Sequence, residues 1–123
     1  MKRAWITGAR GFVGPWLARE LRARGAQVMG IDRPERRPEA DDPTEALELE
    51  LRDSQQVERA LRETRPEFIF HLAAQSSAAL SFEQPMQTLE GNLLSTTGLL
   101  EGLRAVGEGG PVLLAVGSCE EYG

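Results

Sequence analysis

The composition of the chain is typical of one soluble globular domain. It has 123 residues, of which 41% are apolar and 27% charged, and its net charge is -5. This charge excludes broad, charge-driven binding to nucleic acids, because neutralising phosphates requires a basic face. No apolar run approaches the roughly 18–20 residues that cross a bilayer, and the start is no signal peptide, so we expect a cytoplasmic protein without a membrane partner. A single cysteine, Cys119, offers neither an internal disulfide nor a metal site.

A short strand, a glycine-rich turn and a helix are predicted first. Residues 4–7 form an apolar run that ends at Gly8, and residues 11–24 follow the helical period. One face of this helix is expected to be buried, and it carries Val13, Trp16, Leu17 and Leu21. Gly25 ends the helix, and residues 27–32 predict a second strand.

The next segment predicts an exposed loop, a third strand, a helix and a fourth strand. The loop is polar and is punctuated by Pro34, Pro38 and Pro43. Three leucines then alternate with glutamates, the period of an edge strand with one buried face: Leu47, Leu49 and Leu51. Residues 54–65 predict a helix capped by Asp53 or Ser54. Residues 67–72 are almost continuously apolar, as in a strand at the centre of a sheet with both faces covered.

A long helix from about residue 85 to residue 106 is predicted before a fifth strand at 112–116. Its expected buried stripe consists of Leu89, Leu93, Thr96, Leu100 and Leu103. Strands alternate with helices throughout, which predicts an α/β fold: a Rossmann-type doubly wound parallel sheet in the order 3-2-1-4-5. Such domains normally add at least one more strand, so we expect a chain truncated after its fifth strand.

The pattern Gly8-x-x-Gly11-x-x-Gly14 joins the first strand to the first helix. Backbone N–H groups at the start of a helix can face a pyrophosphate, assisted by the helix dipole. The first glycine permits the turn, the next lets the backbone approach the anion, and the last lets helix and strand pack closely. Its place between a strand and an amphipathic helix favours a dinucleotide-binding turn over a merely structural one.

Asp32 ends the second predicted strand, 21 residues after Gly11. An acidic side chain there can accept hydrogen bonds from the adenosine ribose hydroxyls, which favours NAD over NADP. Arg33, Arg36 and Arg37 keep NADP possible, because guanidinium groups bind phosphates well. A strand-end aspartate followed by a solvated basic loop is the alternative.

Several segments in the same order resemble the extended short-chain dehydrogenase/reductase family of nucleotide-sugar epimerases and dehydratases. They are residues 7–14 (TGARGFVG), 51–53 (LRD), 71–76 (HLAAQS), 92–96 (NLLST) and 117–123 (GSCEEYG). The resemblance covers essentially the whole chain. It implies that residues 1–123 are the N-terminal part of an NAD(P)-binding Rossmann domain, and that a C-terminal substrate domain is absent.

The resemblance also implies which residues bind the cofactor. They are Gly8, Gly11, Phe12, Val13, Gly14, Asp32, Arg33, Asp53, Leu72, Ala73, Ala74 and Gln75. Asp53 would bind the adenine amino group, a role compatible with capping a helix. Ala73 to Gln75 would line the nicotinamide side. Asn92 would organise the strand beside the active site, or lie on a solvated helix surface. His71 sits in an apolar strand, where a lone histidine is more often a packed core residue than a catalytic one.

Ser118 and Glu120 follow the carboxyl end of the fifth predicted strand, where parallel sheets of this kind bind ligands. By the resemblance, Ser118 would hydrogen-bond the reacting sugar hydroxyl. Glu120 would be the acid/base glutamate of the 4,6-dehydratases, which removes a proton beside a transient ketone. An ordinary strand-end turn is the alternative for both. Tyr122 matches a structural tyrosine, and the catalytic Tyr-x-x-x-Lys pair of the family is absent, so we expect the 123-residue chain itself to be inactive.

Within the family, residues 75–77 and 81–83 are most similar to the GDP-mannose 4,6-dehydratase branch, whereas residues 117–123 lean toward the GDP-4-keto-6-deoxy-mannose reductases. We therefore expect the intact protein to be an NAD(P)-dependent enzyme, a lyase or an oxidoreductase, that acts on a nucleotide sugar. A 4,6-dehydratase is the first choice, and a reductase or 4-epimerase is the alternative. A non-catalytic NAD(P)-binding module is the alternative outside the enzymes. We also expect a homo-oligomer, because the edge of the fifth strand is open.

Overall fold

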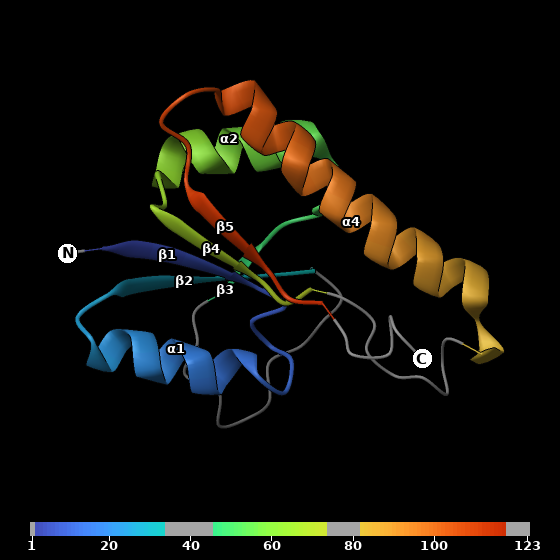
Figure 1. Cartoon of the computed structure of the whole chain (residues 1–123), viewed down its shortest axis with the longest axis horizontal. Helices are drawn as coiled ribbons and strands as arrows, with labels where there is room; N and C mark the ends of the chain where they lie inside the picture. The colour runs from blue at the N-terminus through green and yellow to red at the C-terminus, as the bar shows by residue number, and fades with distance from the viewer. Residues whose placement is uncertain (1, 34–45, 74–81, 118–123) are drawn as a thin grey trace.

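The chain folds into a five-stranded parallel sheet with helices on both faces (Figure 1). This computed structural model describes residues 2–33, 46–73 and 82–117. Its elements are β1 (Arg3–Thr7), α1 (Gly14–Ala23), β2 (Gln27–Asp32), β3 (Ala46–Glu48), α2 (Ser54–Thr64), β4 (Phe68–His71), α4 (Pro85–Val106) and β5 (Val112–Ala115). The strand order is β3-β2-β1-β4-β5 and every pairing is parallel. The predicted fold class and strand order are confirmed.

Two cores lie on the two faces of the sheet. The larger one separates the sheet from α2 and α4, and it contains Trp5, Ile31, Leu49, Leu51, Val57, Leu61, Ile69 and Leu99. The smaller one lies beneath α1 and contains Ile6, Ala9 and Ala18. Trp5 is fully buried, but its Nε1 donates a hydrogen bond to Thr64 Oγ1 (3.0 Å). The polar edge of this indole is therefore satisfied inside the larger core.

α1 begins at Gly14, later than predicted, and buries a narrower face than expected. The residues that reach the core are Gly14, Leu17, Ala18 and Leu21. The prediction that Val13 and Trp16 are buried is wrong, since Trp16 is 62% exposed and Val13 is also exposed. A Cβ at Gly14 would overlap the Ala9 carbonyl. The helix thus meets the turn through its smallest residue, and the bulky side chains next to that contact point outward.

β3 is shorter than the leucine alternation predicts. It ends at Glu48, and the buried side chains of Leu49 and Leu51 lie beyond it. Leu47 is exposed, so the prediction that all three leucines share the buried face of one strand is wrong. The Leu49 N–H still donates to the Asp32 carbonyl (2.9 Å), after which the chain turns toward α2. The predicted loop through Pro34, Pro38 and Pro43 lies outside the described residues.

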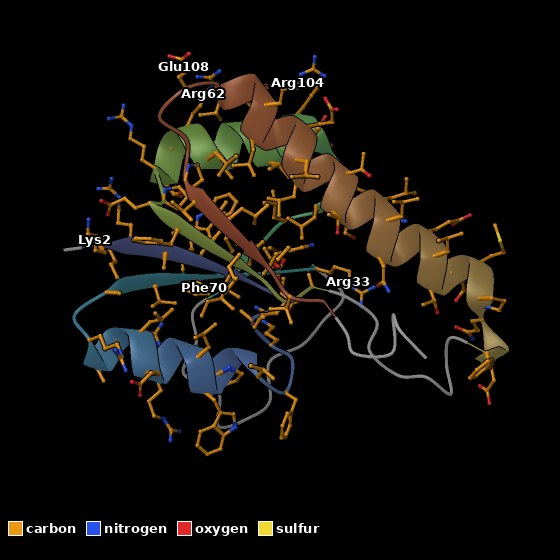
Figure 2. The ribbon with its side chains drawn as sticks, viewed as in Figure 1. Lys2, Arg33, Arg62, Phe70, Arg104 and Glu108 are labelled. Atoms are coloured by element: carbon orange, nitrogen blue, oxygen red, sulfur yellow. The ribbon has the colours of Figure 1, made fainter. Side chains whose placement is uncertain are left out.

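β4 runs between β1 and β5, inside the sheet as predicted, but only one of its faces is fully covered. Ile69 and His71 are buried on the side of α2 and α4, whereas Phe68 and Phe70 are half-buried. Figure 2 shows Phe70 on the side of α1. α1 covers β1 and β2 on that side, so the two phenylalanines receive less cover.

α4 does not bury the stripe that its apolar spacing predicts. Leu89, Leu93 and Leu100 are exposed, and only Thr96 and Leu103 of the expected stripe are half-buried. The prediction is wrong for the three leucines. The first half of α4 extends past the end of α2 (Figure 1), so it has less of the molecule to pack against.

Two glycines let α4 lie close to the layer beneath it. A Cβ at Gly98 would overlap the Leu51 carbonyl, and a Cβ at Gly102 would overlap the Val57 side chain. These glycines lie four residues apart on one helical face, beside the fully buried Leu99. At the other end of this layer, Arg62 of α2 donates to the Ala105 carbonyl (3.0 Å), near Arg104 and Glu108 in Figure 2.

Candidate functional site

The glycine turn lies at the carboxyl ends of β1 and β2. The Gly8 N–H donates to the Ile31 carbonyl (2.9 Å), and the Gly11 N–H donates to the Gly8 carbonyl (2.9 Å). Gly8 has φ of +68°, a left-handed conformation that strongly favours glycine. A Cβ at Gly8 would also lie 3.0 Å from the backbone N and Cα of Ala73. The turn is therefore held against β2 on one side and against the exit of β4 on the other.

The N-terminus of α1 has free capacity to bind an anion. Val13 is the N-cap residue and its side chain makes no capping hydrogen bond, and proline occupies one of the first helical positions. The first N–H groups of a helix lack partners within the helix, and the helix dipole favours negative charge there. Phe12 is 89% exposed beside them. An extended phosphate group can therefore approach the backbone of the turn.

Asp32 lies next to this turn and also holds it in place. The residue is 7% exposed, and its carboxylate accepts two hydrogen bonds, Oδ2 from the Arg10 N–H (2.8 Å) and Oδ1 from the Arg33 N–H (2.8 Å). Arg10 Nη1 lies 3.8 Å from Glu48 Oε1, which connects the turn to β3. Sequence reasoning missed the contact between Asp32 and Arg10, because the spacing of the motif indicates a ligand role and carries no sign of a bond to the turn itself.

Asp53 is the N-cap of α2. Its Oδ1 accepts from the N–H groups of Gln55 (3.1 Å) and Gln56 (3.3 Å), and its Oδ2 accepts from Gln56 Nε2 (3.0 Å). The capping prediction is confirmed, and such a cap is worth about 1 kcal/mol. The adenine contact stays a prediction.

His71 is buried at the end of β4, with both ring nitrogens hydrogen-bonded. It is 5% exposed, its Nδ1 lies 2.7 Å from Thr7 Oγ1 and its Nε2 lies 3.0 Å from Thr96 Oγ1. Burial lowers the pKa of His71 below its usual value of 6.5, since a charged ring loses its hydration there. The prediction of a packed core histidine is confirmed.

The structure brings together only part of the predicted site. Gly8, Asp32 and Ala73 meet around the turn, and the half-buried Asn92 lies on α4, one helical turn before Thr96. Six candidates fall outside the described residues: Arg36, Arg37, Ala74, Gln75, Ser118 and Glu120. Within the described ranges, no group of three or more His, Cys, Asp or Glu side chains could hold a metal ion. No helix in those ranges is long and apolar enough to cross a membrane.

A sequence comparison assigns the chain to a family. The family described as "NAD dependent epimerase/dehydratase family" matches residues 4–123. The chain belongs to this family. The resemblance inferred from the motifs is therefore confirmed, and the family's dependence on NAD agrees with the cofactor expected from the glycine turn.

Two curated relatives are 4,6-dehydratases. The chain is 36% identical over 113 residues to CDP-glucose 4,6-dehydratase of Salmonella typhimurium, covering 86% of this chain and 32% of the relative. It is 35% identical over 119 residues to GDP-mannose 4,6-dehydratase of Vibrio cholerae, again covering 86% of this chain and 32% of the relative. The chain therefore spans about a third of the length of these relatives.

The fold is also similar to a solved structure of an epimerase. UDP-glucose 4-epimerase of Thermus thermophilus, in complex with NAD, superimposes with a TM-score of 0.74 at 37% identity. The match covers 85% of this chain and 34% of that protein. Dehydratases and epimerases that act on nucleotide sugars are thus similar to this chain at nearly the same level of identity.

Proposed function

We propose that the chain is the NAD-binding part of an enzyme of the 4,6-dehydratase type that acts on a nucleotide sugar. The observation that carries this proposal is the glycine turn, where an uncapped helix N-terminus meets the ends of β1 and β2. The names of two relatives, CDP-glucose and GDP-mannose 4,6-dehydratase, support the substrate class. The choice of GDP-mannose rests on the similarity of residues 75–77 and 81–83.

The described residues fit a dinucleotide. Gly8 and Gly14 each stand where a Cβ would crowd the backbone, so they keep the turn packed against the exit of β4 and against Ala9. The close approach to a pyrophosphate is assigned to Gly11. Each oxygen of Asp32 accepts one backbone N–H, and a carboxylate oxygen has a further lone pair with which to accept a ribose hydroxyl. We assign the contacts to the residues inferred from the sequence: Gly8, Gly11, Phe12, Val13, Gly14, Asp32, Arg33, Asp53, Leu72, Ala73, Ala74 and Gln75.

NAD held at the glycine turn would supply hydride transfer at its nicotinamide ring. Around that ring, Ser118 would hydrogen-bond the sugar hydroxyl that is oxidised. Glu120 would take the proton from the carbon beside the resulting ketone, which allows water to leave from the next carbon. The phenolate base that the family takes from a Tyr-x-x-x-Lys pair does not occur in these 123 residues. We therefore expect NAD binding, but no turnover, from this chain alone.

A 4-epimerase is the second candidate, because the epimerase of Thermus thermophilus is as similar to this chain as the dehydratases are. Epimerisation returns the hydride to the same carbon and needs no acid/base glutamate, so Glu120 separates the two candidates. A reductase, favoured by residues 117–123, would only deliver hydride to a 4-keto sugar. A binding module without catalysis would bind NAD and convert none of these sugars.

Two experiments test the proposal. Calorimetric titration of the 123-residue chain with NAD should show saturable binding, and its absence from a chain with a folded circular dichroism spectrum would contradict the proposed cofactor role. The full-length natural protein with NAD and GDP-mannose or CDP-glucose should yield a 4-keto-6-deoxy product. Formation of the 4-epimer would identify an epimerase, and no conversion of any nucleotide sugar would favour the binding module.

A further inference from the structure

A continuous chain of hydrogen bonds runs from the exit of β4 through His71 to α4. Thr7 Oγ1 lies 3.0 Å from the Leu72 N and 3.2 Å from the Ala73 N, and 2.7 Å from His71 Nδ1. On the other side of the ring, Nε2 lies 3.0 Å from Thr96 Oγ1. These hydrogen bonds join β1, β4 and α4 through the His71 ring.

The donors in this chain fix the tautomer of His71. The N–H groups of Leu72 and Ala73 can only donate, so together they fill the two lone pairs of Thr7 Oγ1. The Thr7 hydroxyl hydrogen is then left for His71 Nδ1, which must be an acceptor. At the far side, the Thr96 hydroxyl donates to the Asn92 carbonyl (2.9 Å), so Thr96 Oγ1 accepts from Nε2. Both ends match the neutral ring with its proton on Nε2.

A proton on Nδ1 has no place in this arrangement, because it would face the Thr7 hydroxyl hydrogen. To accept it, Thr7 would have to release one of its two backbone donors. The Leu72 N–H has a second acceptor, the Thr7 carbonyl at 3.2 Å, so it is the donor that Thr7 Oγ1 can release. Among the described residues, the Ala73 N–H has Thr7 Oγ1 as its acceptor. Ala73 is also the residue whose N and Cα lie 3.0 Å from the Cβ position of Gly8. Protonation of His71 therefore breaks one of the two hydrogen bonds by which the Thr7 hydroxyl holds the exit of β4, directly beside the wall of the glycine turn.

We propose that His71 is a positioning residue of the cofactor site, whose neutral Nε2–H form locks the exit of β4 against the glycine turn and whose protonation weakens NAD binding. The inference rests on the proposed function only in its last step, because the lock itself is a property of the fold. His71 touches no reacting atom in this account. It acts on the cofactor through Thr7 and the exit of β4.

The surroundings of the ring support a response to pH. β1 presents Thr7, α4 presents Thr96 and Asn92, and β5 pairs Ala115 with His71, so none of the described partners is charged or titratable. Burial alone acts on the pKa of His71 and lowers it. The neutral ring is therefore the dominant form at neutral pH, and the lock opens as the pH falls through this lowered pKa.

The chain contains one histidine, so its ring signals in NMR spectra are unambiguous. Two-bond ¹H–¹⁵N correlations of the 123-residue chain at pH 7.5 should show the Nε2–H tautomer. On acidification, the backbone amides of Gly8 and Ala73 should shift with the same midpoint as the ring. A proton on Nδ1 at neutral pH, or a ring that titrates without moving these amides, would overturn the inference. Neither readout requires NAD.

Binding measurements with matched variants test the last step. NAD affinity should fall about tenfold below the midpoint, the cost of about one hydrogen bond. His71→Asn, which can accept from Thr7 and stays neutral, should remove this pH dependence. Thr96→Val should weaken NAD binding at pH 7.5, whereas Thr97→Val should not, since Thr97 Oγ1 donates only to the Leu93 carbonyl (2.7 Å). An unchanged pH profile in His71→Asn would contradict the proposed coupling.

The two proposals can fail separately. A chain that binds no NAD at any pH would contradict the proposed function, and the amide titration of Gly8 and Ala73 would then decide on the lock alone. A chain that binds NAD with equal affinity above and below the His71 midpoint would support the proposed function and overturn the coupling.

Discussion

At the scale of single residues, Asp32 has a structural role, and we propose that it also binds the cofactor. It fixes the backbone of Arg10 and Arg33 through one oxygen each. In the proposed site, its negative charge would lie beside the adenosine ribose. The same carboxylate repels a 2′-phosphate, while nearby arginines attract one. The balance between these charges decides which cofactor binds.

We predict that NAD binds more tightly than NADP and that Asp32→Asn narrows this difference, because the substitution removes the repelling charge but keeps one acceptor. An effect of about tenfold on the ratio of the two affinities corresponds to about 1.4 kcal/mol. Calorimetric titration with each cofactor measures it. Glu108→Gln removes the same charge from an exposed acid after α4 and should leave the ratio unchanged. Tighter binding of NADP by the unmodified chain would mean that the arginines outweigh Asp32.

We expect the buried His71 ring to make the free energy of unfolding depend on pH. Because burial lowers the pKa of the folded ring below 6.5, the unfolded chain takes up a proton first as the pH falls. Stability should therefore decrease from pH 6.5 downward until the folded ring is also protonated. Glu50 and Glu67, whose pKa values lie below their usual 4.5, lose their contribution only at lower pH. Urea unfolding at pH 7.5 and 5.5 tests this, and an equal loss in His71→Asn would contradict the assignment.

At the scale of elements, the sequence predicts the strands, their order and the glycine turn, because these depend on apolar period and on local backbone geometry. It does not predict which faces α1 and α4 bury. The spacing of apolar residues identifies a buried face by its large side chains. Gly14, Gly98 and Gly102 instead allow close contact with neighbouring backbone and side chains because they have no side chain. The hydrogen bonds of Asp32 to the turn and of His71 to Thr7 and Thr96 were also missed, since they join residues that no local pattern connects.

Two glycines of α4 provide a matched test of this packing. Gly98→Ala should destabilise the chain by about 1–3 kcal/mol, since its Cβ would overlap the Leu51 carbonyl. Gly91→Ala places the same methyl group on the same helix in open space and should stabilise it by up to about 1 kcal/mol. Urea unfolding of both variants measures the difference. Equal effects would show that α4 does not lie as close to the layer beneath it as described.

At the scale of the whole molecule, the chain leaves much apolar surface uncovered. Val112, Leu114 and Val116 are exposed in and just after β5, and Leu89 and Leu93 are exposed on α4. On the α1 side, a hollow between α1 and β4 is lined partly by Leu21, Phe68 and Phe70. Surfaces of this kind mark places where other protein normally packs.

We predict that the 123-residue chain self-associates with increasing concentration. Sedimentation velocity at several concentrations should show a rising average mass. Leu93→Lys or Leu114→Lys should reduce the effect, because a charge replaces an exposed leucine. Glu63→Lys, an exposed position on α2, adds a positive charge elsewhere and serves as the control. A monomer at all concentrations would contradict the prediction.

The most direct test of the whole account is an NMR titration of the ¹⁵N-labelled chain with NAD. We expect the largest amide shifts on residues 8–14, with further shifts at Asp32, Arg33 and Ala73. The amide signals of Gly109 and Gly110 should not shift, because these residues precede β5 and lie at the opposite ends of the strands from the glycine turn. No saturable shifts, or shifts centred away from the glycine turn, would contradict the claim that this turn is the cofactor site.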